Sequence, residues 1–296
     1  MTALIVLSVR YGTTRIPLGD VASASATGLG FGGEPGPMDR IVFDLRLPRA
    51  VFSAVIGAGL GIVGVVLQTT TRNDLADPFL FGLSSGAAAG AVFVITVTGD
   101  VLGIWPLPLA AFRGGIVASL NMLTLVQSLR NAAPEKLILA GLAVSFLFAA
   151  ITNYLIFSGD SRAAHSIVFW MLGGLGLARW QSLPLVLAGL ALILAYATYR
   201  RRWLDALLAG DRTAKSLGGP VTRLRMTMFL MAALATAAFV SVAGVIGFVG
   251  PALRTAADIL SRVILAPQEL PVGIVTTSVG AIFVFALLIG GSKTAR

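Results

Sequence analysis

The sequence predicts an all-α membrane protein, a bundle of helices that cross the bilayer. Of its 296 residues, 56% are hydrophobic and only 12% are charged, and the mean hydropathy is +0.90. An ordinary soluble domain is about 25% charged. The uncharged runs are too long and too continuous for barrel strands, which alternate over about ten residues, so the spans are expected to be helices.

Each predicted span is an uncharged run of about the 20 residues that a helix needs to cross a bilayer. In chain order the runs are 50–71, 78–99, 137–159, 180–199, 226–253 and 270–292. The run 101–129 is a further candidate, interrupted by Arg113. Residues 1–9 are apolar but short, and no basic residue precedes them. We therefore expect the remainder of a first span there, and no cleaved signal peptide.

The positions of Lys and Arg predict the orientation, because short loops rich in these residues stay in the cytoplasm. Basic residues gather in 200–225 and at the C-terminal end, so both are expected inside. Because consecutive spans cross the bilayer in opposite directions, the loop 130–136 is then expected inside. The segments 10–49 and 160–165 and the region of Arg262 are expected outside. The net charge of +9 is thereby explained by topology, so a nucleic-acid-binding surface is not favoured.

Several classes of chemistry are disfavoured by composition. The chain has no cysteine, which removes disulfides, thiolate zinc sites and thiol catalysis. Its one histidine, His165, is expected to be a solvated loop residue, with a ligand or gate role as the alternative. The predicted spans lack acidic residues, which disfavours an intramembrane enzyme and a proton- or sodium-coupled carrier. The segment 290–294 lacks the Gly-Lys pair of a phosphate-binding loop, so no ATPase site is expected on this chain. No metal or cofactor site is expected on it either.

Glycines spaced four residues apart predict close packing between helices. Gly57 and Gly61 form one such pair, and Gly82, Gly86 and Gly90 form a second row. Residues at this spacing share one helical face, where a missing side chain lets two backbones approach. Ordinary packing is the main expectation for these glycines, and the lining of a pathway is the alternative.

Nine short motifs in one order carry a resemblance to a known family. They occupy residues 45–49, 57–68, 73–78, 82–87, 139–143, 170–174, 216–218, 242–250 and 269–275. On them the chain is identified as a member of the permease subunits of type II ABC importers for iron-siderophores, haem and vitamin B12, the FecCD/BtuC-like family. The resemblance covers nearly the whole chain.

The resemblance implies a single permease domain over 1–296 that pairs with a second copy of itself, the two enclosing a pathway in the bacterial inner membrane. A periplasmic binding protein would cap it outside, and two cytoplasmic ABC ATPase subunits would use ATP and Mg²⁺ to drive it. The expected cargo is an iron chelate, either a ferric siderophore or haem. Cobalamin is the alternative, and an ATP-independent secondary transporter is a less favoured one.

The resemblance also assigns outer-surface roles. Arg46, Arg49 and Arg262 match arginines that receive acidic residues of the binding protein, and exposed guanidiniums suit such docking because they pair bidentately with carboxylates. Interfacial anchoring of a helix start is the alternative. The pathway and its helix packing are assigned to Gly57, Gly61, Gln68, Asn73, Ser84, Ser85 and Gly86.

The cytoplasmic loop 200–225 resembles the coupling helices that seat in a groove of the ATPase. An apolar stripe and polar contacts, as such a contact needs, come from Trp203, Leu204, Leu207, Leu208, Gly210, Asp211, Arg212, Lys215, Leu217 and Gly218. An amphipathic helix on the membrane surface is the alternative.

The chain departs from the family in its number of spans. About ten are usual, whereas about eight are readable here, and after Gly250 the segment 251–255 leads almost at once into 257–262. Such a loss would leave lipid-facing gaps in each protomer. We therefore hypothesise that the polypeptide is longer than this sequence, and an intact mass near 30.6 kDa would contradict that hypothesis.

Overall fold

The computed structural model describes residues 2–12, 14–31, 36–74, 76–78, 82–98, 105–128, 134–245, 251–264 and 270–279. Helices joined by turns account for the regular structure of these ranges, and no strand occurs within them. The predicted all-α class is confirmed.

The helices follow one another along the chain with short connections. They are α1 (Thr2–Arg10), α2 (Leu18–Gly28), α3 (Pro37–Arg40), the π-helix η1 (Ile41–Arg46), α4 (Leu47–Thr71), α5 (Leu83–Thr98), α6 (Pro106–Ser128), α7 (Pro134–Ser158), α8 (Ser161–Met171), the 3-10 turn η4 (Trp180–Ser182), α9 (Leu183–Tyr199), α10 (Arg201–Leu208), α11 (Asp211–Ser216), α12 (Val221–Ala243) and α13 (Pro251–Val263). Residues 272–279 are also helical.

Most of the predicted spans correspond to helices of membrane-crossing length. Among the described residues, five helices are long and apolar enough to span: Pro37–Thr71, Pro106–Ser128, Lys136–Ser158, Trp180–Tyr199 and Val221–Ala243. The predicted run 78–99 forms α5, which is apolar but only 16 residues long. Arg113 lies within α6 and does not interrupt it.

The predicted span 226–253 is wrong at both of its ends. The helix α12 starts at Val221 and ends at Ala243, because Gly244 adopts a φ of 70°, which a helix cannot continue. Gly244 also lies so close to Trp170 that an added Cβ would overlap its carbonyl oxygen. Of the predicted span 270–292, residues 272–279 are helical and those beyond 279 lie outside the described residues.

Two segments expected to be loops are largely helical. The outer loop 10–49 contains α2, α3 and η1, and η1 runs directly into α4. The loop 160–165 is the beginning of α8, so the backbone of His165 is helical, whereas the prediction made it a loop residue.

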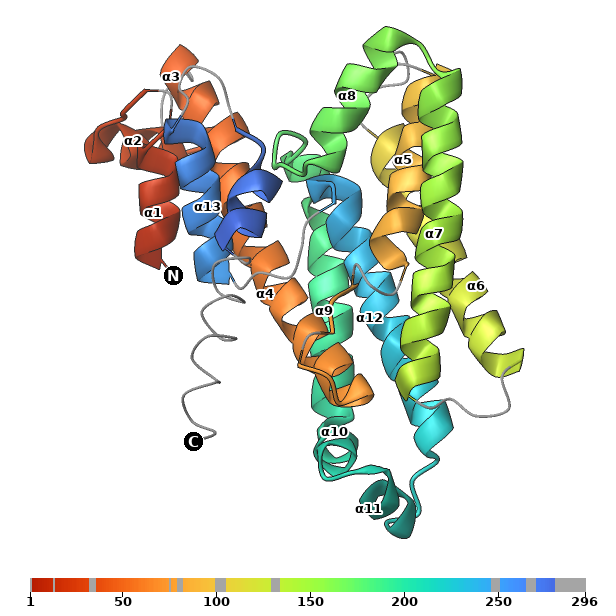
Figure 1. The fold of residues 1–296 in the computed structure, drawn as a ribbon. Helices are drawn as coiled ribbons and strands as arrows, with labels where there is room; N and C mark the ends of the chain where they lie inside the picture. Colours follow the sequence, from red (N-terminus) through yellow and green to blue (C-terminus); the bar gives the residue numbers. More distant parts are fainter. Residues whose placement is uncertain are drawn as a thin grey trace, which may run out of the picture.

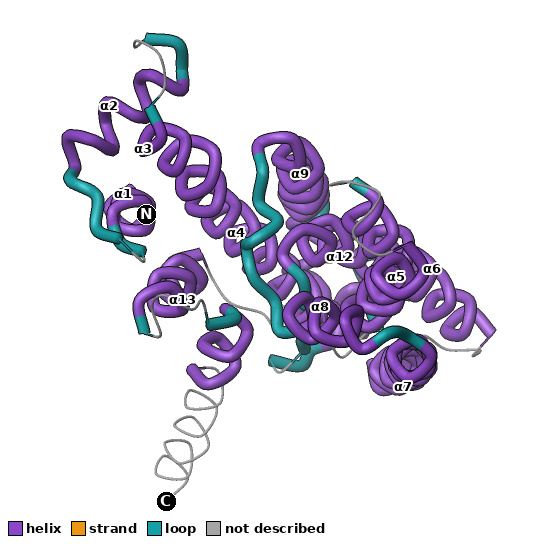
Figure 2. Tube along the Cα trace, turned by 90° about the horizontal axis from the view of Figure 1, so that it is seen from above, coloured by secondary structure: helices purple, strands orange, loops and turns teal. Residues whose placement is uncertain are grey.

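The helix α12 is the centre of the bundle. It packs against α4, α6, α9 and α5, and a buried core joins these helices around Phe52, Phe229 and Phe239. The long helix α4 runs obliquely, with α1, α2 and α13 on one side of it and α5, α6, α7, α8, α9 and α12 on the other (Figure 1, Figure 2). The fold therefore places α13 against the outer half of α4.

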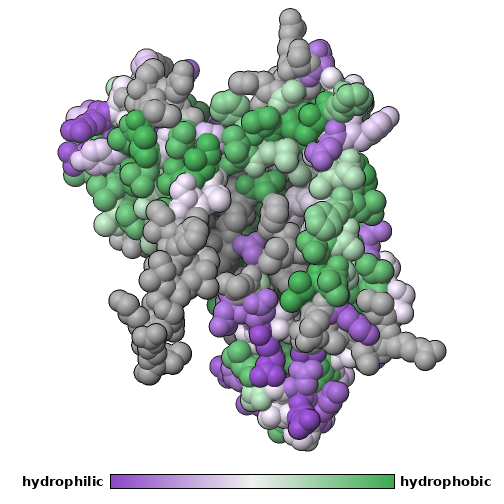
Figure 3. Space-filling model, viewed as in Figure 1, coloured by the Kyte–Doolittle hydropathy of each residue, from purple (hydrophilic) through white to green (hydrophobic). Residues whose placement is uncertain are grey.

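The two ends of the bundle carry different elements. α10 and α11 form one end, whereas α3 and α8 lie at the opposite end (Figure 1). Hydrophilic side chains gather over α10 and α11, and hydrophobic ones cover much of α7 and α8 (Figure 3). The separation of 200–225 from 10–49 and 160–165 agrees with the sequence-based alternation.

The close packing predicted for the glycine row is confirmed for Gly86 and Gly90, at the contact between α5 and α6, whereas Gly82 precedes α5 and an added Cβ there would lie against Val144 of α7. An added Cβ on Gly86 would lie 2.5 Å from the carbonyl oxygen of Gly114, and one on Gly90 would overlap the carbonyl oxygen of Ala110. The backbones of the two helices therefore touch directly, as small residues permit within a membrane.

Candidate functional site

The end formed by α10 and α11 has a defined backbone geometry. Gly210, between the two helices, has a φ of 115°, and Gly218, just after α11, has a φ of 80°. The amide of Gly219 donates to the carbonyl oxygen of Ala214 at 2.9 Å, the hydrogen bond of a Schellman cap. Positive φ favours glycine, so both predicted coupling glycines are turn residues that set the angle of α11.

Asp211 and Arg225 join this end to the transmembrane helices. Asp211 starts α11, and its two carboxylate oxygens accept hydrogen bonds from Nη2 and Nη1 of Arg225 at 2.6 and 2.9 Å. The Nε of Arg225 donates to the carbonyl oxygen of Thr70 at 3.0 Å. That carbonyl lies in the last turn of α4, where backbone acceptors lack partners within the helix. One buried guanidinium thus connects α4, α11 and α12.

The expected apolar stripe is divided between the core and the surface. Leu208 is 58% exposed and Leu217 is 64% exposed, so both are available to a partner. Leu207 is fully buried in the main core, and its place on a contact surface was wrongly predicted. Trp203 and Leu204 are half-buried against the same core.

The charged residues of the loop occupy different settings. Arg212 and Lys215 are exposed on α11, next to the exposed Leu217. Asp211 instead faces Arg225. The surface that remains for a partner therefore combines two leucines with two basic side chains.

At the opposite end, Arg46 is turned into the protein. Its side chain is 7% exposed, Nη1 donates to the carbonyl oxygen of Val9 at 3.0 Å, and Nη2 donates to the carbonyl and hydroxyl oxygens of Thr14 at 2.8 and 2.9 Å. A cation is favourable at the C-terminal end of α1, where the helix dipole is negative. The expectation of an exposed guanidinium is therefore wrong at this position.

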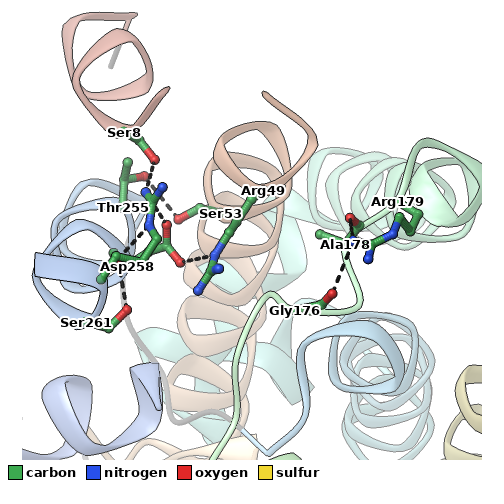
Figure 4. Close-up of polar contacts among 10 residues, drawn as sticks. Ser8, Arg49, Ser53, Gly176, Ala178, Arg179, Thr255, Asp258 and Ser261 are labelled. Carbon is green, nitrogen blue, oxygen red and sulfur yellow. Dashed lines mark hydrogen bonds and ion pairs between the residues drawn. The ribbon is translucent and has the colours of Figure 1, made fainter. Parts of the chain in front are cut away.

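Arg49 and Arg262 share the buried carboxylate of Asp258. Figure 4 shows the Arg49 side chain pointing at this carboxylate. The Nε of Arg49 donates to Oδ1 of Asp258 at 2.8 Å, and Nη2 of Arg262 lies 2.7 Å from Oδ2 of the same residue. Arg262 also donates to the hydroxyl of Ser8 at 2.7 Å. This cluster connects α1, α4 and α13, and Arg262 is buried in it, contrary to the expected exposure. The docking role of the three arginines stays a prediction.

Arg254 is a further buried cation of this region, and it was missed in the sequence. It is fully buried, and none of its three guanidinium nitrogens has a hydrogen-bond partner. Burial lowers its pKa to about 10, which leaves it charged at neutral pH. Arg254, Asp258 and Arg262 are spaced four residues apart, so a helical reading of that spacing could have placed all three on one face.

The glycines assigned to α4 face different surroundings. Gly61 has open space where a Cβ would stand, and Gly57 is buried. The close approach to α12 occurs at Gly59 instead, where an added Cβ would overlap the ring of Phe239. Gly61 therefore makes no close packing contact within the protomer, and packing at the buried Gly57 stays a prediction.

The polar residues assigned to the pathway make hydrogen bonds to nearby backbone groups. Nε2 of Gln68 donates to the carbonyl oxygen of Asp74 at 2.9 Å, and the amide of Asn73 donates to the carbonyl oxygen of Gln68 at 3.2 Å. Ser84 is buried, and the hydroxyl of Ser85 donates to the backbone three residues earlier at 3.0 Å. Gln68 and Asn73 thus close the end of α4, beside the end formed by α10 and α11.

Comparison with known proteins gives the family. The model of the FecCD transport family matches residues 1–253 and 249–290, two stretches that meet where the chain departs from the usual family pattern. A cobalamin import system permease protein of Halobacterium salinarum is 37% identical over 86% of this chain and 75% of its own length. A vitamin B12 import system permease protein of Escherichia coli is 31% identical over 84% of each chain.

A solved structure has the same fold. Described as an inward-facing conformation of a putative metal-chelate type ABC transporter, it superposes with a TM-score of 0.76 at 25% identity, covering 92% of this chain and 96% of that one. The family match extends over most of the sequence, and the named relatives are import permeases. The chain therefore belongs to the FecCD transport family, the permease subunits of type II ABC importers.

Proposed function

We propose that two copies of this chain form the membrane pathway of an importer whose ATPase subunits bind at the end formed by α10 and α11. The observation that carries the proposal is the contact of Arg225 with both Asp211 and the last turn of α4. Leu208 and Leu217 are exposed at the same end, as a helix-in-groove contact needs.

The geometry suits transmission of movement from the ATPase. A force on α11 reaches α4 and α12 through charge-assisted hydrogen bonds, which are stronger than neutral ones. Arg225 is buried while its partner Asp211 is partly exposed, so movement of α11 is expected to reach the helix ends that Arg225 joins. ATP-driven closure of two ATPase subunits would then rock the paired spans between outward and inward access.

The remaining parts of the complex follow from the same orientation. The C-terminus and the loop 200–225 lie in the cytoplasm, and a binding protein docks at the end formed by α3 and α8. The membrane is the bacterial inner membrane or its equivalent. The net charge pattern supports this orientation, because the basic loop 200–225 is at one end of the bundle.

The cargo is proposed to be a bulky metal chelate. The sequence-based preference was an iron chelate, a ferric siderophore or haem. The name of the Halobacterium relative favours a second candidate, cobalamin, and the described residues supply no feature that separates the two. Selection between them is expected to reside in the binding protein.

Reconstituted transport tests this function. The permease, its ATPase and its binding protein are placed in proteoliposomes, and uptake of a ferric siderophore, haem and cobalamin is measured with and without ATP. Uptake of one chelate that requires ATP supports the proposal. Accumulation by the permease alone, driven only by an ion gradient, would show a secondary transporter instead.

A further inference from the structure

A groove of about 870 Å³ lies between α6 and α12, at the end of the bundle formed by α10 and α11. Its described lining residues are Leu123, Gln127, Lys215, Gly219, Pro220, Val221, Thr222, Arg223, Met226, Thr227 and Leu230. None of the residues assigned to the pathway is among them.

The groove lies on the side of α12 that faces away from α4. Arg225 and Met228 of α12 contact the end of α4, where each bonds to Thr70, at 3.0 and 3.4 Å. Met226 and Leu230 line the groove, and at about 100° per residue they fall on the opposite side of the helix. The body of α12 therefore separates the groove from the end of α4, to which pathway residues are assigned.

The rim of the groove is positively charged. Lys215 and Arg223 are exposed there, and neither forms an ion pair with a described residue. Among the described lining residues none is acidic, and Asp211, the acid of α11, is held by Arg225. The rim also lies at the N-terminal end of α12, where the helix dipole is positive. An anion is therefore the complementary ligand.

Beyond this rim the wall of the groove is apolar. It is formed by Leu123 of α6 and by Met226 and Leu230, which lie about one and two turns inside α12, and both helices are of membrane-crossing length. Basic groups at the helix ends and apolar side chains between the spans match the order of headgroup and acyl chain in a phospholipid. Basic pockets between membrane-spanning helices on the cytoplasmic side suit anionic headgroups.

We propose that one anionic phospholipid of the cytoplasmic leaflet binds in this groove, with its phosphate near Lys215 and Arg223 and an acyl chain along the wall between α6 and α12. The apolar wall favours a lipid over free phosphate, and the bilayer around α6 and α12 supplies it. The site goes beyond the proposed function, because the transported cargo takes no part in it.

Lipid retention by the purified permease–ATPase complex in detergent tests the proposal. Dioleoylphosphatidylglycerol is added, and bound copies are counted by native mass spectrometry, with dioleoylphosphatidylcholine as the zwitterionic lipid of the same chains. We expect one phosphatidylglycerol per permease copy, held about thirtyfold more tightly than phosphatidylcholine, as two basic residues contribute near a membrane surface. Excess inorganic phosphate should not displace it. Equal retention of the two lipids, or displacement by phosphate, would overturn the proposal.

Two matched pairs of substitutions locate the site. Lys215→Gln with Arg223→Gln removes both basic side chains of the groove and should weaken phosphatidylglycerol about thirtyfold. Arg201→Gln with Arg202→Gln removes the same charge from exposed positions on α10 that do not line the groove, and should leave the affinity close to that of the unchanged complex. Equal losses in the two pairs would indicate diffuse attraction by a basic surface and would overturn the proposal.

Lys215 also belongs to the surface proposed for the ATPase, so subunit composition is read from the same spectra. If the double variant loses the ATPase, Arg223→Gln alone decides the question, with an expected loss of about fivefold against Arg201→Gln. Unchanged phosphatidylglycerol affinity in Arg223→Gln would overturn the proposal. A change in the number of permease copies in that variant would assign the groove to a contact between two copies and would also overturn it.

Discussion

The carboxylate of Asp211 accepts two hydrogen bonds from the guanidinium of Arg225, and the same guanidinium holds the carbonyl of Thr70 at the end of α4. The pair spans the junction between a partly exposed short helix and two buried long ones. Asp211 was predicted as a coupling residue from its loop, whereas Arg225 was seen only as one of the basic residues that fix topology. In the structure the two side chains form one hydrogen-bonded unit with the carbonyl of Thr70.

Breaking this unit should uncouple ATP hydrolysis from uptake. Asp211→Asn keeps the shape but removes the charge, and hydrogen bonds to charged groups contribute about 1.5–3 kcal/mol. We expect uptake in proteoliposomes to fall about tenfold, a loss of about 1.4 kcal/mol, while the ATPase rate changes little. Asp205→Asn, at an exposed position on α10, is the control. Equal coupling in the Asp211 variant and the control would contradict the role given to Arg225.

Substitutions of the neighbouring Leu208 and Leu207 should affect different properties, ATPase binding for the first and fold stability for the second. Leu208→Asp places a charge on an exposed side chain and should weaken co-purification of the ATPase without lowering the melting temperature. Leu207→Ala removes a fully buried side chain and should destabilise the fold by about 2–5 kcal/mol. Leu29→Asp, at an exposed position directly after α2, is the control for surface charge. ATPase binding that survives Leu208→Asp would exclude this surface as the contact.

Asp258 should be required for stability. Its carboxylate lies between Arg49 and Arg262, so Asp258→Asn leaves buried cations without their counter-charge. Removing one partner of a buried ion pair typically costs about 3–5 kcal/mol. A clear fall in the melting temperature is expected, whereas Asp20→Asn, at an exposed position on α2, should leave it unchanged. Similar melting temperatures for both variants would mean that the cluster is not structural.

Charge reversal at Arg46 together with Arg49 should weaken docking of the binding protein, as the family resemblance implies. Because both side chains also make internal contacts, the melting temperature must be measured alongside the affinity. Lower affinity at a retained melting temperature supports docking. Loss of both supports the internal role alone, and unchanged affinity removes these arginines from the docking surface.

The contact between α5 and α6 should not tolerate a methyl group. Gly90→Ala would force the two backbones apart, and overpacking of this kind typically costs about 1–3 kcal/mol. Gly176→Ala is the control, since an added Cβ there meets open space. Equal thermal stability of the two variants would contradict the direct backbone contact.

Much of the architecture could be predicted because hydropathy is a local property. An uncharged run of spanning length becomes a helix in the bilayer whatever its neighbours are, so α4, α6, α7 and α9 appear within a few residues of their expected positions. The end of α12 was missed because a single glycine with positive φ stops the helix inside an apolar run. The pairing of Gly86 and Gly90 with α6 could be anticipated from spacing, but the partner helix could not.

The sequence by itself determined that this protein is a multi-span helical permease, and its motifs placed it in its family. Only the tertiary structure decided which side chains are available to partners. Leu207 and Leu208 are adjacent, yet one is in the core and the other in solvent, and Arg46 is occupied by carbonyls 32 and 37 residues away. The physical reason is that the direction of a helix face depends on neighbours remote in the chain, about which local composition carries no information.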